Sequence, residues 1–456
     1  LSGNTVDFLM EHVNADDTST IISGAINKLW KNGVSGDDLT DITPAGYTIS
    51  GNKWKGASLL DKALICQAGH EPVVYEEGVS PAAKTLSTHT STTAAFGSSY
   101  PQDVIASYGR FWAHDGTSVY WSTDIADSAF PAFFNGSSGL LNISSVLPNN
   151  VDKIVALASH NGFLIILCEN NIVIYKGADN VLTSFALLDV ITGVGCVARD
   201  SVAYTGNDLI FLSDTGVRSL GRLLQEKSLP MRDLTKNVRD DLLGDLLAER
   251  GSGEGLTKVT AVYSEIYAFY LLSFPTTQTI YCLDMRQPLE DGSARVTQWY
   301  TYQATSLLRT RDRRVLIGKA DGIGLYTGST DNGSPYRIRY FSHYLDLQSP
   351  TQLKILKLIK ATVIGGSNQS FVIKAGFDYS TATRSYPFTL ADRGVSEYGV
   401  SEYDIGEFSI GINLDSVKSS VGGSGNVIQI GFEANVNGSE LSVQKLDIFV
   451  KTGRTS

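Results

Sequence analysis

The sequence predicts an all-β protein: a β-propeller of about six blades, with a helical insertion, followed by a C-terminal β-sandwich-like domain. Three observations predict this class. Gly 44, Tyr 21 and Phe 18 stand against Met 3, a balance typical of strands and tight turns. A hairpin unit recurs along the chain, and the pattern changes near residue 346. The 456 residues also exceed the ~250–300 that one compact core usually holds.

The recurring unit is an apolar or aromatic strand, a short polar turn and a second apolar strand. It lies at 110–122, 162–177, 208–221, 265–284 and 313–328, with a weaker copy at 62–78. Most copies are roughly 40–50 residues apart, the length of a four-stranded propeller blade. Turn pairs such as Asn170-Asn171 and Asp321-Gly322 predict positive φ. We therefore predict a propeller over residues 1–345, with the least readable pattern before Asn52.

Residues 228–250 interrupt the strands with a predicted amphipathic helix. Its apolar residues are spaced four apart, at Leu234, Val238, Leu242 and Leu246. Asp233 or Ser228 is the candidate N-cap, and Gly251 ends the helix. Two interpretations remain open for this helix: it packs on its own propeller, or Leu242 and Leu246 form a surface for another subunit.

Residues 346–456 read as alternating strands separated by Gly, Ser and Asn, which predicts a separate β-sandwich-like domain. Within it the repeat GVSEYGVSEYD (394–404) has an odd period of five, which cannot keep one strand face buried, so a loop or irregular edge is expected. The nearby carboxylates Glu397, Glu402, Asp404 and Glu407 match no calcium-binding loop. They fit a solvated face or a subunit contact better than a calcium site.

The arginines of RTRDRR form the clearest charge cluster, at Arg309, Arg311, Arg313 and Arg314. They precede the strand VLIG and are candidates for an interface, through phosphate or through the acidic residues of a neighbour. A solvated strand edge protected by charge is the simpler alternative.

Motifs for catalysis or cofactor binding do not emerge, so we predict no catalytic residues, no cofactor and no metal ligands. AHDGTSVYW (113–121) lacks the spacing of a sialidase Asp-box and reads as a hairpin turn. GVGCVARDS (193–201) contains only a short GxG. The six scattered histidines read as surface or turn residues. The four cysteines lack metal-ligand spacing and read as reduced, buried thiols of a protein assembled in a cytoplasm.

The formal net charge of −10 argues against sequence-specific DNA binding, which requires a basic surface to neutralise phosphates. No stretch approaches the ~20 apolar residues of a membrane span, and no secretion signal is visible. The chain begins at Leu1, so an upstream leader or strand remains open.

Three stretches resemble the tail nozzle and packaged-DNA-stabilisation proteins of short-tailed bacteriophages. The first is VIASYGRFWAHDGTSVYWSTDIADSAFPAFF (104–134). The second joins DKIVALASHNGFLIILCENNIVIYKGA (152–178) to GVGCVARDSVAYTGNDLIFLSDTGVRSL (193–220), and the third is GNVIQIGFEANVNGSELSVQKLDIFVKTGR (425–454). They cover about two-fifths of the chain, in the order that the family shows.

The resemblance implies a structural virion protein that forms a homo-oligomeric, hexameric ring at the distal end of the tail. Its expected partners are the tail adaptor or tubular protein, tail fibres or spikes, and non-specific double-stranded DNA in the lumen. The resemblance further implies that it is assembled in the host cytoplasm, retains DNA before ejection and passes it during ejection. Two alternatives stay open: a propeller glycoside hydrolase, and a glycan-binding adhesin with Trp112, Trp121 and Trp299 along a groove.

Overall fold

The computed structural model describes the chain except residues 1–4, 33–38, 48–52, 90–95, 97–98, 125–132, 134–137, 148–150, 226–232, 254, 301, 367, 391–413 and 456. It divides into two compact units, residues 1–326 and 327–456. The boundary therefore lies before the predicted position at residue 345. The reason is β27 (Tyr336–Phe341), which pairs with β33 (Ile428–Val436) of the second unit. Within the described ranges, no helix is long and apolar enough to cross a membrane.

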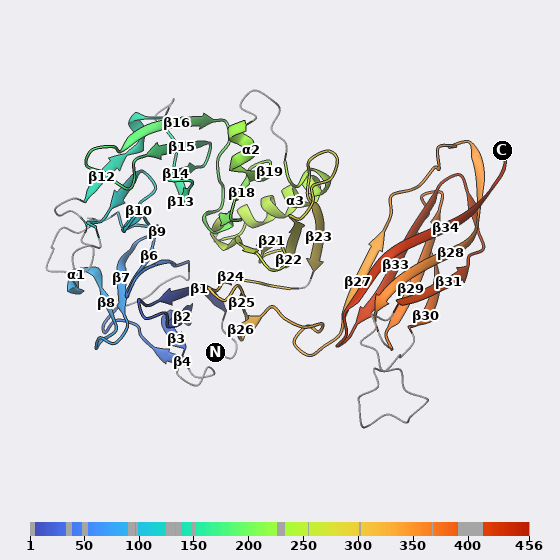
Figure 1. The fold of residues 1–456 in the computed structure, drawn as a ribbon, viewed down its shortest axis with the longest axis horizontal. Helices are drawn as coiled ribbons and strands as arrows, with labels where there is room; N and C mark the ends of the chain where they lie inside the picture. The colour runs from blue at the N-terminus through green and yellow to red at the C-terminus, as the bar shows by residue number, and fades with distance from the viewer. Residues whose placement is uncertain are drawn as a thin grey trace. The chain divides into compact units, whose positions relative to one another are not determined.

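The first unit is a β-propeller, in which the described residues form seven antiparallel sheets around a common centre (Figure 1). We number these blades 1 to 7 along the chain. Blade 1 contains β1 (Val6–Val13), β2 (Ser19–Ala25), β3 (Lys28–Asn32) and β4 (Leu39–Asp41), and blade 2 contains β5 (Lys55–Leu59), β6 (Lys62–Gln67), β7 (His70–Glu76) and β8 (Ala83–Thr85). Blade 3 contains β9 (Asp103–Ser107), β10 (Arg110–His114), β11 (Ser118–Trp121) and β12 (Gly139–Asn142). Blade 4 contains β13 (Ile154–His160), β14 (Phe163–Cys168), β15 (Asn171–Lys176) and β16 (Ala186–Thr192).

Blade 5 contains β17 (Ala203–Tyr204), β18 (Leu209–Ser213) and β19 (Gly216–Ser219). Blade 6 contains β20 (Thr260–Ser264), β21 (Phe269–Phe274), β22 (Thr279–Asp284) and β23 (Arg295–Tyr300), and blade 7 contains β24 (Ser306–Arg309), β25 (Val315–Lys319) and β26 (Gly322–Leu325). The helical segments between strands are α1 (Leu86–His89), η1 (Ile143–Ser145), η2 (Arg199–Ser201), α2 (Leu220–Gln225), η3 (Lys236–Val238), α3 (Arg239–Arg250) and η4 (Gly255–Lys258). The first strands of neighbouring sheets contact one another, so they line the centre.

All six predicted hairpins are confirmed, and they form the second and third strands of blades 2 to 7. The seventh blade, one more than the predicted six, is β1–β4 from the N-terminal stretch with the weakest pattern. The turn prediction was wrong at Asn170-Asn171, where neither residue has a positive φ. Asp152 holds that turn instead, through the backbone N–H of Asn170 at 3.1 Å and the side chain of Asn171 at 2.6 Å.

The second strands are mostly buried on both faces, because each lies between two neighbouring blades. In β14, Leu164, Ile166 and Cys168 pack toward blade 3. Ile165 and Leu167, which alternate with them, pack toward blade 5. A strand buried on both faces reads as a continuous apolar run, which explains the sequence FLIILC.

Among the described residues, no strand is shared between blades 7 and 1, and one isolated β-bridge joins Thr5, just before β1, to Ala320 of blade 7. Three buried residues, Val6, Leu9 and Ala25, form the apolar core of this seam in the described structure, and partly buried side chains such as Leu308 and Leu316 pack against them. The hydroxyls of Thr305 and Ser306 each donate to the carbonyl oxygen of Val6 at 2.7 Å. The seam therefore depends on a few polar contacts and a close backbone approach.

The second unit is a β-sandwich, as predicted. One sheet has the order β27-β33-β29-β30, and β28 lies in the other sheet between β34 and the pair β31 and β32. The remaining bounds are β28 (Gln352–Gly365), β29 (Ser370–Phe377), β30 (Arg384–Thr389), β31 (Leu414–Ser420), β32 (Ser424–Gly425) and β34 (Leu441–Thr455). Buried side chains from both sheets, such as Ile359 and Phe371, share one core. The repeat at 394–404 and its nearby carboxylates lie outside the described residues.

A glycine in β25 provides a test of the seam. A Cβ added at Gly318 would lie 2.0 Å from the Ser306 Oγ atom and 2.5 Å from the Val6 carbonyl oxygen. We expect Gly318→Ala to lower the free energy of unfolding by about 2 kcal/mol or more, because it overpacks the seam. At Gly324 the nearest heavy atom would be 3.8 Å away, so Gly324→Ala should stay within about 0.5 kcal/mol in the same urea titration. Equal effects of the two substitutions would contradict this account of closure.

Candidate functional site: the centre of the propeller

The centre of the propeller is crossed by a short segment of blade 5. Its first strand, β17, has only two residues, and η2 precedes it. From η2, the Arg199 guanidinium donates to the carbonyl oxygens of Lys53 at 3.2 Å and Trp54 at 3.3 Å, both next to β5. It also donates to the carbonyl oxygen of Gln102, just before β9. Blade 5 is thus joined to blades 2 and 3 through the centre.

Asp200 completes this crossing with two cations. Its carboxylate accepts from Arg199 at 2.7 Å and from the Lys55 ammonium group of β5 at 2.9 Å. The Arg199 and Asp200 side chains are only 14% and 20% exposed. Burial acts to raise the pKa of Asp200, but the two cations outweigh it and hold the pKa below its ordinary value. The aspartate is therefore a charged structural bridge and not a proton donor near neutral pH.

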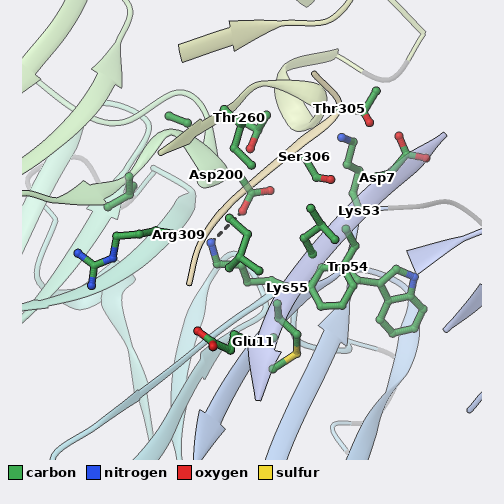
Figure 2. Close-up of a pocket in the computed structure, with 18 residues that line it drawn as sticks. Asp7, Glu11, Lys53, Trp54, Lys55, Asp200, Thr260, Thr305, Ser306 and Arg309 are labelled. Atoms are coloured by element: carbon green, nitrogen blue, oxygen red, sulfur yellow. Dashed lines mark hydrogen bonds and ion pairs between the residues drawn. The ribbon is translucent and has the colours of Figure 1, made fainter. Parts of the chain in front are cut away.

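A cavity of about 290 Å³ lies beside this bridge. Its walls come from β1, β5, η2, β20 and β24, and Figure 2 shows the Lys55–Asp200 ion pair at its edge. Among its charged residues, Arg309 pairs with Glu265, and Glu11 accepts the backbone N–H of Arg311 at 2.5 Å. This volume is at the lower limit of small-molecule sites, ~300 Å³. The centre of the propeller is therefore partly filled, and these charged side chains are paired with groups of the same chain.

A second buried polar group lies in blade 3. His114 is fully buried, and its Nε2 atom is 3.7 Å from the Asp103 carboxylate. The His114 Nδ1 atom accepts the backbone N–H of Gly116 at 3.1 Å, and Asp103 accepts that of Leu157 in blade 4 at 2.8 Å. Burial lowers the pKa of His114 to about 4. The expectation that the histidines are surface or turn residues was wrong here, and also for the buried His12 and His160.

The four predicted interface arginines all pair with carboxylates of their own chain. Two of them join blade 7 to blade 6, one joins it to blade 1, and one stays within the turn. The pairs are Arg309–Glu265, Arg313–Glu265, Arg311–Asp17 and Arg314–Asp312. The cluster therefore connects the last blade to both of its neighbours, a role that neither sequence interpretation included.

The predicted helix is shorter than expected. α3 begins at Arg239, and its N-cap Val238 makes no side-chain capping bond. Ser228, one of the two candidate N-caps, lies outside the described residues. Asp233 accepts the Thr235 backbone N–H and hydroxyl instead, at 2.8 and 2.6 Å, which fixes a turn before η3 and the helix. The predicted end at Gly251 is confirmed.

The predicted interface residues of α3 lie in the interior. Leu242 and Leu246 are buried in a core cluster with residues of blades 5 and 6. The fully buried Glu249 carboxylate accepts the backbone N–H of Thr276 at 3.0 Å and its hydroxyl at 2.8 Å. The helix thus packs on its own propeller, the first of the two interpretations, and Leu247, 64% exposed, is its main apolar surface residue.

The three tryptophans do not form one groove. Trp112 is fully buried in blade 3, and its ring centroid is 5.6 Å from that of the partly buried Trp121. Trp299 is in blade 6, where it stacks on Tyr326. The Asp115 carboxylate accepts the backbone N–H groups of Thr117 and Ser118, at 2.9 and 2.8 Å, which makes the AHDGTSVYW segment a hairpin turn.

The four cysteines form no disulfide; Cys66, Cys168 and Cys196 are buried, and Cys282 is partly exposed. Burial raises the pKa of the Cys196 thiol to about 12, so it is protonated and unreactive at neutral pH. In the part of the chain that the structure covers, no three His, Cys, Asp or Glu side chains gather as a metal site.

Comparison with known proteins identifies no matching family model and no matching curated protein. Among solved structures, a protein from Lactobacillus plantarum is similar at 11% identity and TM-score 0.43, over 73% of this chain and 93% of that one. PorZ, a type-IX secretion component of Porphyromonas gingivalis, is similar at 13% identity and TM-score 0.40, over 71% of this chain and 37% of PorZ. A chain of the mitotic checkpoint complex is similar at 9% identity and TM-score 0.41, over 69% and 87%.

Substitution of Arg199 tests the central bridge. Arg199→Met leaves the Asp200 carboxylate with one cation and three carbonyl oxygens without this donor. We expect a loss of about 2–3 kcal/mol in the free energy of unfolding, measured by urea titration. The matched control is Arg286→Met, which removes an exposed arginine–aspartate pair with Asp284 and should leave the midpoint unchanged. An Arg199→Met variant with the urea midpoint of the wild-type chain would contradict a stabilising role for the bridge between blades 2 and 5.

The low pKa of His114 predicts acid sensitivity. The unfolded chain binds a proton at the ordinary value of 6.5, and the folded chain only at about 4. The contribution of neutral His114 to the free energy of unfolding is therefore complete above pH 6.5. It is lost as the pH falls toward 4, by about 3 kcal/mol in all. Urea midpoints measured from pH 7 to pH 4.5 should fall less steeply for His114→Asn. Some slope should remain, because burial also lowers the pKa of His12; identical slopes would refute the assignment.

Proposed function

We propose that this chain is a structural protein of a phage virion, the nozzle at the distal end of a short tail. The ordered resemblance of three stretches is the observation that carries this proposal. They fall on blade 3, on blades 4 and 5, and on strands β33 and β34. A propeller with a helical insertion and a separate sandwich is the architecture that the resemblance implies.

In this proposal, the DNA path lies between copies of the chain. The propeller centre is crossed by Arg199, Asp200 and Lys55, and its cavity of about 290 Å³ has no room for a duplex. A lumen for DNA must then be formed by several copies around a common axis. The net charge of −10 supports a passage that repels phosphate, along which DNA slides without being held tightly.

The charge pairing at the centre supports a structural role over glycoside hydrolysis. A hydrolase needs two carboxyl groups on either side of a scissile bond, about 5–10 Å apart. At this cavity, Asp200 is bound to Arg199 and Lys55, Glu11 accepts a backbone N–H, and Asp7 accepts the Thr5 hydroxyl at 3.2 Å. These carboxylates stabilise the ring, which leaves them committed to contacts within the chain.

Negative-stain imaging of the purified chain tests the proposal. We expect closed rings with a central hole, six copies in each, and incorporation into tail particles when the adaptor protein is added. Duplex DNA should not be retained by the ring in a gel-shift assay at physiological salt, because the acidic surface repels it. A chain that stays monomeric at high concentration and fails to join tail particles would refute a nozzle.

A further inference from the structure

Blade 7 has an open outer edge. Five of the seven blades have four strands, whereas blade 7 has three, β24-β25-β26, in the part of the chain that is described. Blade 5 also has three strands, but residues 233–235 cover its third strand: Leu234 donates its backbone N–H to the carbonyl oxygen of Val217 at 3.0 Å. No described segment covers β26 in this way.

The backbone of β26 presents hydrogen-bonding groups toward this open side. Tyr326 donates its N–H to the carbonyl oxygen of Val315 at 2.9 Å, and Gly324 lies opposite Ile317. Because bonded and non-bonded pairs alternate along an antiparallel ladder, Gly324 bonds to β25. The N–H and carbonyl groups of Ile323 and Leu325 therefore point away from β25.

The side chains leave room for another strand. β26 has the sequence GIGL, and a Cβ at Gly324 would have no heavy atom closer than 3.8 Å. Leu325 is 43% exposed. Glycine inside a strand weakens the strand and often marks the close approach of another backbone. An uncharged edge of this kind is the type that proteins normally cover.

Charge indicates what covers this edge. Arg313 and Arg314 are 68% and 58% exposed and lie just before β25, level with the end of β26. Their pairs with Glu265 and Asp312 are solvent-exposed, so a partner carboxylate can replace them at little cost. The chain itself has 47 acidic against 37 basic residues, so the surface of a second copy suits this arginine-flanked edge.

We propose that the outer edge of β26 binds an extended segment of a second copy of this chain, as the fourth strand of blade 7. The segment runs antiparallel to β26, with an acidic residue at its start beside Arg313 and Arg314. This inference rests on the proposed oligomeric function and names one contact between its copies.

Hydrogen exchange with residue resolution tests the contact without any substitution. In dilute, monomeric protein, the Ile323 and Leu325 amides should exchange rapidly, whereas the Gly324 amide is protected by β25. At concentrations where the chain assembles, all three amides should be protected, because the added strand accepts the two outward N–H groups. Rapid exchange at Ile323 and Leu325 in the assembled protein would overturn the inference and leave the proposed function standing.

A pair of substitutions at Leu325 provides the matched comparison. Leu325→Pro removes the outward N–H and leaves the β25–β26 ladder intact, whereas Leu325→Ala shortens the same side chain and keeps the N–H. We expect the proline variant to require about tenfold higher concentration than the alanine variant for half-assembly in sedimentation. Equal assembly of two folded variants would overturn the inference. A wild-type chain that never assembles would refute both this contact and the nozzle proposal.

Discussion

The fold depends on the two-sided burial of the second strand of each blade. Such a strand has no solvent face, so it remains stable only while a blade lies on either side of it. In β14, Ile166 belongs to a core that blade 4 shares with blade 3, and Ile165 belongs to a core that it shares with blade 5. A lone hairpin of this composition is marginal in water, so closing the ring is the condition under which every blade is stable.

The stability of the propeller therefore depends on the contacts between its first and last blades. In the described part of the chain, a single β-bridge and no shared strand joins the first and last blades, and the apolar core at the seam is small. Polar contacts compensate for this: hydroxyl groups of blade 7 bond to the Val6 carbonyl oxygen, and Arg311 pairs with Asp17 of blade 1. The Arg199 bridge adds a tie through the centre, so the ring is held both around its circumference and across it.

The hairpins could be predicted because their signal is local. Apolar strands on both sides of a polar turn appear within about fifteen residues of sequence, and the structure confirms each predicted hairpin.

Blade 1 was missed because its strands, such as VDFLMEHV, mix apolar and charged residues. β27 was assigned to the propeller because its partner β33 lies far along the chain. The Arg199 bridge has no sequence pattern at all, since its partners include the carbonyl oxygens of Lys53 and Trp54, which every residue type provides.

The arrangement also explains why the sequence carries few signals of catalysis. At the centre, Lys55 and Asp200 are bound to each other, and in the arginine cluster of blade 7, Arg309 and Arg311 pair with the two neighbouring blades. Polar groups paired in this way stabilise the closed ring. What remains available is the outer surface, where β26 presents backbone groups and Leu325 an apolar side chain. In the proposed assembly, contacts between copies would then form at this outer surface, while the paired groups of the interior keep the ring closed.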